Sequence, residues 1–169
     1  MDDRIPLRAD ESHTLRRLVA AIAYRSARVL KDVPEGYPDF SPGNGVRPPR
    51  EIVSHMSSVL AYAYGRLSDT KRIRHDLADW DTERDRFYGK LESIDDAIAT
   101  GAALNEGELD QLLQGPFADV LTHIGQLAMM RRMCGAPVPG ENYFLADIQI
   151  GCVSIEQADP AVPDPATEK

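Results

Sequence analysis

Residues 49–67 read PREIVSHMSSVLAYAYGRL, and this stretch decides the fold class of the 169-residue chain. Its apolar residues recur at intervals of three and four, which is the spacing of one face of an α-helix. Proline is tolerated in the first turn of a helix, so Pro48 and Pro49 suit the beginning of this one. The sequence therefore predicts an amphipathic helix with one face to bury, made of Ile52, Met56, Val59, Leu60, Ala63 and Leu67.

Two further segments repeat this pattern on either side of the opening stretch. The first begins near Asp10 or Ser12, either of which can cap a helix, and it must end by Pro34. The second runs from about Trp80 to Gly101, a residue type common at helix ends. Both segments are predicted to be amphipathic helices.

The connection over residues 33–49 is dense in proline and glycine, which excludes regular structure there. Tyr37 and Phe40 are its aromatic residues, and we expect them to order it. A connection of this length favours a helical bundle with a crossover over plain up-and-down hairpins.

A fourth helical pattern starts near Glu106 and runs toward Met133. The pair Gly115-Pro116 should kink or split it, because proline cannot donate the backbone hydrogen bond of a helix interior. Four amphipathic segments without a convincing strand predict an all-α protein. The expected architecture is a four-helix bundle in which each apolar face is buried against its neighbours.

Length and composition predict one folded unit. At this length a single domain is the default, and we place it at residues 1–153. Residues 143–153 have too little length or alternation to separate a helix from a strand. Residues 154–169 are rich in proline and acid, and we expect a mobile tail there.

The charge balance bears on partners and location. The formal net charge is −8, from 27 acidic and 19 basic residues. A field of this sign repels phosphate groups, so neither nucleic acid nor a membrane is an expected partner. No signal-peptide pattern or long uncharged apolar run is present, and Cys134 and Cys152 do not form the pattern of a disulfide-stapled fold. We expect a cytoplasmic protein.

Two of the four histidines stand out by position. His13 and His75 fall on polar stretches, whereas His55 and His123 lie within strongly apolar helical patterns. His55 comes three residues after Ile52, and the helical repeat is expected to place it on the row that faces the core. A polar imidazole in such a place needs a partner.

Asp119 and His123 are four residues apart, which stacks their side chains about one turn apart on one helix face. If the helices around residues 55 and 123 are neighbours, His55 can supply a third metal ligand across the interface. A competing interpretation, in which the histidines are structural, has equal weight. A buried histidine often only hydrogen-bonds a carbonyl or carboxylate, and a bare D-x-x-x-H spacing is not specific.

A family resemblance bears on this choice. Residues 123–135, HIGQLAMMRRMCG, resemble the last-helix signature of the DinB/YfiT-like superfamily, in which H-x-G-Q leads into apolar residues, an arginine and a glycine. Residues 46–55, VRPPREIVSH, resemble the segment that begins a helix and ends in that family's first ligand histidine. The segment GAPVP at residues 135–139 is also typical of the family.

The resemblance implies a bundle of DinB/YfiT-like type with a divalent-metal site. The family's first ligand falls on His55 and its last on His123, while Asp119 stands where the family usually has another histidine. Zinc and nickel are the leading identities of the ion. Glu51 and Gln126 are candidates to orient the ligand histidines.

The function that the resemblance implies is that of a metal-dependent enzyme, a transferase or hydrolase that acts with a small-molecule thiol. The alternative is a non-catalytic helical module, such as a homodimer, with structural histidines. Met129, Met130 and Met133 are interpreted as packing residues and not as a soft-metal site.

Overall fold

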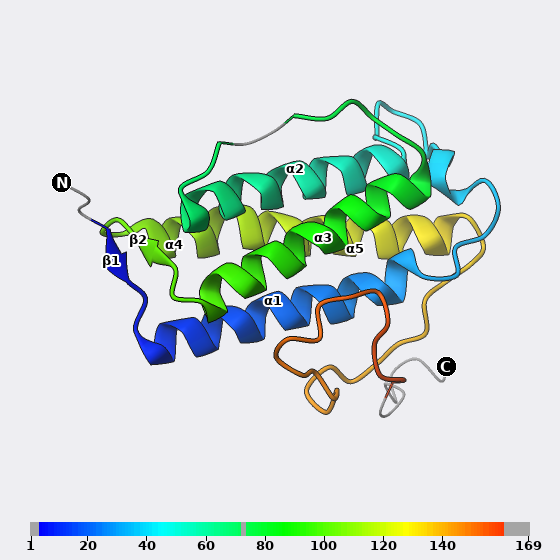
Figure 1. The fold of residues 1–169 in the computed structure, drawn as a ribbon. Coiled ribbons are helices and arrows are strands. Elements are labelled where there is room, and N and C mark those ends of the chain that lie inside the picture. Colours follow the sequence, from blue (N-terminus) through cyan, green and yellow to red (C-terminus); the bar gives the residue numbers. More distant parts are fainter. Residues whose placement is uncertain (1–3, 72–73, 161–169) are drawn as a thin grey trace.

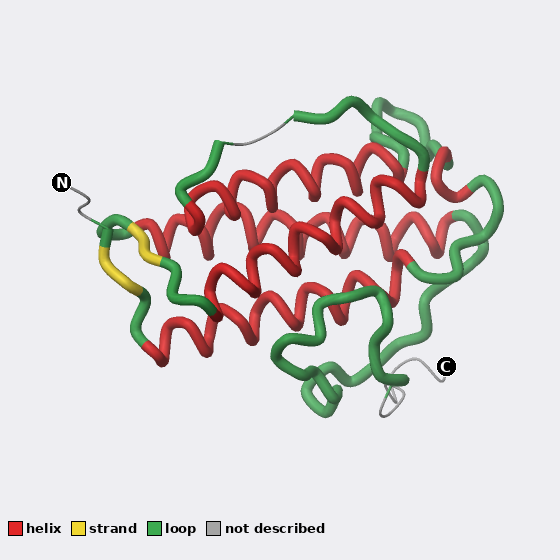
Figure 2. Tube along the Cα trace, viewed as in Figure 1, coloured by secondary structure: helices red, strands yellow, loops and turns green. Residues whose placement is uncertain are grey.

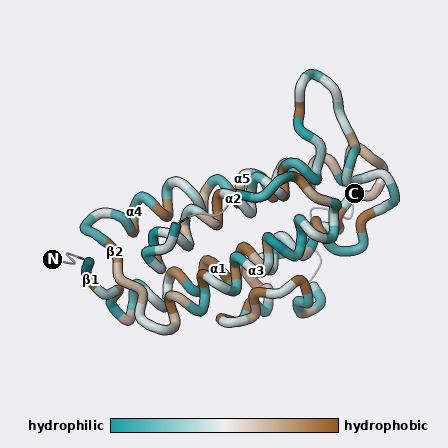
Figure 3. Tube along the Cα trace, turned by 45° about the horizontal axis from the view of Figure 1, so that its top comes forward, coloured by the Kyte–Doolittle hydropathy of each residue, from teal (hydrophilic) through white to brown (hydrophobic). Residues whose placement is uncertain are grey.

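Four long helices lie side by side in the computed structural model, which describes residues 4–71 and 74–160 (Figure 1, Figure 2). Their bounds are α1 Ala9–Leu30, α2 Pro49–Ser68, α3 Trp80–Ala99 and α5 Ala118–Met133. Hydrophobic and hydrophilic residues alternate along each of them (Figure 3). The prediction of an all-α protein with four packed helices is confirmed. Across the described ranges, no helix combines the length and apolar character that a membrane crossing needs.

The helices form a ring in which α2 and α1 each pack against both α3 and α5. Near the end of α5, Arg131 Nη1 donates to the carbonyl of Lys31, 3.1 Å away, at the end of α1. Arg50 Nη1, at the start of α2, donates to the carbonyl of Ala78, 3.2 Å away, just before α3. Hence α1 and α5 run parallel to each other, as do α2 and α3 (Figure 1). The bundle therefore has a crossover, but it is the connection between α2 and α3 that crosses; the long first connection, from which a crossover was predicted, joins neighbouring ends of α1 and α2 (Figure 1).

The connection after α1 is ordered by Tyr37, which lies in a short 3-10 turn, Tyr37–Asp39. Its side chain is buried, and its hydroxyl donates to the carbonyl of Leu127 at 2.8 Å. The Tyr37 ring also meets the Trp80 ring edge to face, with centroids 5.8 Å apart. Burial raises the pKa of the Tyr37 hydroxyl. The long connection is thus fixed to both α5 and α3.

We expect Tyr37→Phe to lower the free energy of unfolding by about 1 kcal/mol, because it leaves the Leu127 carbonyl without this donor. Urea denaturation monitored by circular dichroism measures the change. Tyr62→Phe is the matched control, since Tyr62 is exposed and the same substitution there should be nearly neutral. Equal effects of the two substitutions would contradict a stabilising role for the Tyr37 hydroxyl.

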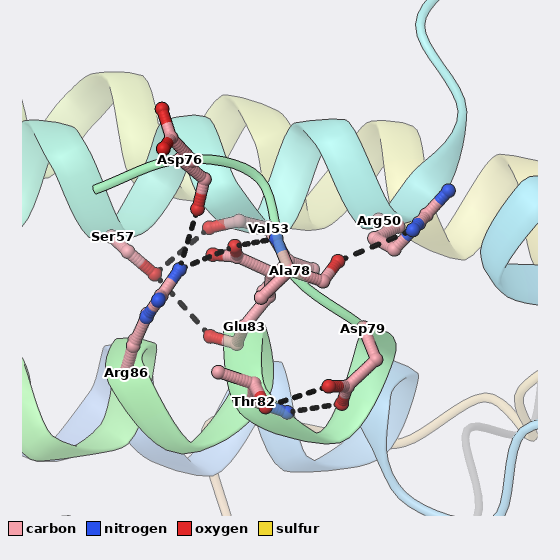
Figure 4. Close-up of polar contacts among 9 residues, drawn as sticks. All are labelled: Arg50, Val53, Ser57, Asp76, Ala78, Asp79, Thr82, Glu83 and Arg86. Atoms are coloured by element: carbon pink, nitrogen blue, oxygen red, sulfur yellow. Dashed lines mark hydrogen bonds and ion pairs between the residues drawn. The ribbon is translucent and has the colours of Figure 1, made fainter.

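The segment that leads into α3 is held by one buried carboxylate (Figure 4). Glu83 is almost fully buried, and its Oε1 accepts hydrogen bonds from the Ala78 amide and from Arg86 Nη1, both at 2.8 Å. The same Arg86 nitrogen donates to the carbonyl of Asp76 at 2.9 Å. Asp79 caps α3, because its side chain accepts a hydrogen bond from the Thr82 amide.

The fourth helical pattern is split, as the Gly-Pro pair predicted. A short helix, α4 Glu108–Leu112, passes through a π-helical turn, Leu113–Phe117, into α5. Pro116 lies inside the wide turn, where its missing N–H removes one donor from the regular pattern.

A small ribbon was not predicted. Strands β1 Ile5–Pro6 and β2 Ala103–Leu104 pair in antiparallel fashion, and this contact ties the start of the described chain to the turn after α3. The segment 143–153 forms neither a helix nor a strand but a series of turns.

The chain after α5 lies against α1 (Figure 1). The Glu141 side chain is buried, and it accepts hydrogen bonds from the Tyr24 hydroxyl and from Arg28 Nε, the latter at 3.2 Å. Farther along, Lys31 Nζ lies 2.6 Å from a Glu156 carboxylate oxygen. Arg28 Nη2 of α1 also donates to the carbonyl of Ala158 at 2.6 Å, so the first residues of the proposed tail contact α1. Residues 161–169 lie outside the described residues, and the boundary at residue 153 stays a prediction.

Candidate metal centre

The three side chains predicted as ligands come together at the interface of α2 and α5. His55 Nε2 from α2 lies 3.2 Å from Asp119 Oδ2 of α5. His123 Nε2, one turn along α5, lies 3.5 Å from Asp119 Oδ1. The imidazole rings of His55 and His123 meet edge to face with centroids 4.8 Å apart. Thus α2 and α5 are neighbours, as a shared site requires.

The three side chains offer a compact set of donor atoms. One potential ligand atom from each lies within 4.8 Å of those of the other two. A tetrahedral ion with ligands at about 2.1 Å needs its ligand atoms to be roughly 3.4 Å apart. The observed spacings require only small side-chain adjustments, and two imidazoles with a carboxylate suit a divalent transition metal. Among the described residues, this is the one group of three or more His, Cys, Asp or Glu side chains with such spacing.

The orientation of His123 is set by Gln126. His123 Nδ1 lies 2.7 Å from Gln126 Oε1, and an amide oxygen can only accept, so the ring donates its proton there. In the neutral ring this leaves the lone pair on Nε2, which faces Asp119. The contact is the one expected for a residue that orients a metal-ligating histidine. Glu51, the other candidate for such a role, is exposed and makes no hydrogen bond to His55 in the described structure.

The site is partly open to solvent. The side chains of His55, Asp119 and His123 are 35%, 42% and 16% exposed. The expectation that His55 faces the core is therefore wrong. The buried face of α2 is centred on Met56 and Leu60, and the helical repeat of roughly 100° per residue places His55 at the edge of that face.

Two clefts meet at the site. One, of about 1060 Å³, is bordered by the loop at residues 42–47, by α2, and by α5 from Thr122 to Met133. The other, of about 790 Å³, is bordered by α2 and by the chain around the π-helical turn. His55 and Thr122 line both clefts. His123 also lines the larger cleft and Asp119 the smaller one, so each cleft reaches two of the three side chains.

The structure corrects the interpretation of the methionines as packing residues. Met130 is buried, but Met129 and Met133 are each about half exposed and line the larger cleft. Their spacing of three and four matches a core stripe, which is why the sequence pattern was misleading. His13 and His75, which the sequence set aside, are exposed and outside the group of three.

No known family model, curated protein or solved structure matches this chain. The fold and the site therefore define its class by themselves. It is a four-helix protein with a His/His/Asp group that can hold a metal ion.

Proposed function

We propose that the chain is a metal-dependent enzyme of DinB/YfiT-like type, with His55, Asp119 and His123 as the ligands of one divalent ion. The observation that carries the proposal is the convergence of these three side chains, from two helices, at the junction of two clefts. Zinc or nickel is the proposed ion, because both accept imidazole and carboxylate ligands.

The proposed reaction is a transfer or hydrolysis that uses a small-molecule thiol. Three protein ligands leave coordination positions open, and a bound ion would supply Lewis acidity to a thiol or a water molecule there. The chain's own contribution is positional. Gln126 holds the His123 ring, and the two clefts give a substrate access to the open side of the site. The Asp119 carboxylate adds negative charge, which lowers the electrophilicity of an ion relative to a site of three histidines.

The partial exposure of the three side chains favours this proposal over structural histidines. A histidine that serves only packing is expected to be enclosed, with both nitrogens satisfied within the core. Here all three side chains face clefts. The non-catalytic module remains the competing hypothesis and predicts no stoichiometric metal.

Elemental analysis of the untagged protein, purified without added metal, tests the proposal. We expect close to one equivalent of zinc or nickel per chain, removable by a chelator and restored by the ion. Protein that holds no metal, even after incubation with several divalent ions, would contradict the proposal and leave the non-catalytic helical module as the remaining hypothesis. Where metal is found, chelator-sensitive consumption of small-molecule thiols in transfer assays tests the reaction class.

A further inference from the structure

The larger cleft gathers exposed apolar side chains beside the His/His/Asp group. Val46, Met129 and Met133 are each about half exposed, and the buried residues Ile52 and Met130 line the same cleft. Soluble proteins rarely leave several large apolar side chains exposed together unless they bind a ligand or partner there. The cleft volume of about 1060 Å³ is at the upper end of the range for small-molecule sites.

The charge of this cleft differs from that of the whole molecule. The chain has 27 acidic and 19 basic residues, yet none of the described residues that line the cleft is Asp or Glu. Arg47 lines it, is exposed, and forms no ion pair with any residue in the described part of the chain. An unpaired guanidinium in an acid-free cleft offers a site for an anionic group.

The cleft is also elongated. Its α5 wall runs from His123 to Met133 along residues spaced by three and four, and ten residues of α-helix extend over roughly 15 Å. One end of this wall carries a member of the His/His/Asp group, and the other carries methionines. Flexible, polarisable methionine side chains suit apolar ligands of varied shape.

We infer that the cleft binds an amphipathic anion, a molecule with an elongated apolar body and one carboxylate or phosphate group. The body lies along the methionines, and Arg47 pairs with the anionic group. That this molecule is the substrate of the metal centre rests on the proposed function. The binding itself needs only the cleft residues, so it can be tested without metal.

Calorimetric titration of the chelator-treated, full-length protein tests the inference. The probes are octanoate, octyl phosphate and octanol, which share the apolar body and differ in the head group. We expect both anions to bind more tightly than octanol. A clear preference between the two anions would identify the head group. Equal binding of octanoate, octyl phosphate and octanol, or no binding of any, would overturn the inference.

Variants separate the contribution of the Arg47 ion pair from that of the apolar contacts. Arg47→Gln should weaken anion binding about fivefold and leave octanol binding unchanged, because a partly exposed ion pair contributes modestly. Met129→Glu should weaken binding of all three probes. Arg132→Gln is the matched control, since Arg132 is exposed on α5 and does not line the cleft. Equal effects of the two arginine substitutions would refute the role of Arg47. Because all titrations use metal-free protein, a failed metal analysis would leave their outcome intact.

Discussion

His123→Ala is expected to lower the affinity for the divalent ion by at least about 100-fold, which is the upper end of what loss of a mere orienting residue costs. The substitution removes one of three ligands and also frees Gln126 from its contact with the ring. In metal-free protein the same change should alter the free energy of unfolding by less than about 1 kcal/mol, because the side chain lines the larger cleft and alanine favours the helix. A large loss of metal affinity together with a small change in the free energy of unfolding is the result expected of a metal ligand.

Competition with a chromophoric chelator measures the affinity, and urea denaturation of the metal-free protein measures the stability. Gln126→Leu should give an intermediate loss of about 10- to 100-fold, because it keeps the ligand and removes its orientation. His13→Ala should change neither quantity, since His13 is exposed and outside the group. If His123→Ala unfolds the protein while metal binding persists, the histidine is structural and the proposed centre is wrong.

The four helices could be predicted because their signals are local. The apolar spacing of residues 49–67 and the proline before it placed α2 to within a residue or so, and the predicted start of the third segment at about Trp80 is the observed start of α3. Gly115-Pro116 likewise predicted the irregular turn that splits the last helix. Each of these features depends on a few neighbouring residues, which a sequence displays directly.

The parts that could not be predicted depend on distant contacts. Strands of two residues have no alternation to detect, so the pairing of Ile5 with Leu104 leaves no trace in the sequence. Glu141 looks like any surface acid, yet it is buried by Tyr24 and Arg28, more than 110 residues away. Burial of such a group is a property of the assembled structure.

The residues of the candidate site could be predicted from the sequence, but their burial and the clefts around them could not. The spacing of Asp119 and His123 and the family resemblance identified the three side chains, and the packing of α2 on α5 brought them together. Whether a residue at the edge of a helix face is buried depends on what covers that edge. The sequence therefore predicted more burial for His55 than the structure shows. The cleft that Arg47 lines was not predicted, because loop residues carry no periodic pattern.

Glu83→Ala is expected to lower the free energy of unfolding by about 3 kcal/mol. The buried carboxylate accepts from the Ala78 amide and from Arg86, so its loss leaves a partly buried amide unpaired and removes a charge-assisted hydrogen bond. Arg86 is about one third exposed and can turn to water, which limits the cost. Thermal and urea denaturation at several temperatures measure the change.

Two variants test whether the loss of stability arises from the hydrogen bonds of the Glu83 carboxylate, which act as a local anchor for the segment before α3. Glu83→Gln keeps an oxygen that can accept from the Ala78 amide, so it should recover a substantial part of the stability. Glu92→Ala makes the same change at an exposed position of α3 and should cost less than about 0.5 kcal/mol.

The hydrogen bonds of the Glu83 carboxylate join the segment before α3 to the helix itself. That segment also meets α2 through the contact of Arg50 with Ala78. Loss of Glu83 should therefore expose amides of residues 76–79 to faster hydrogen exchange while the α2–α5 interface stays protected. Equal acceleration at both places would mean that Glu83 acts on global stability and not as a local anchor.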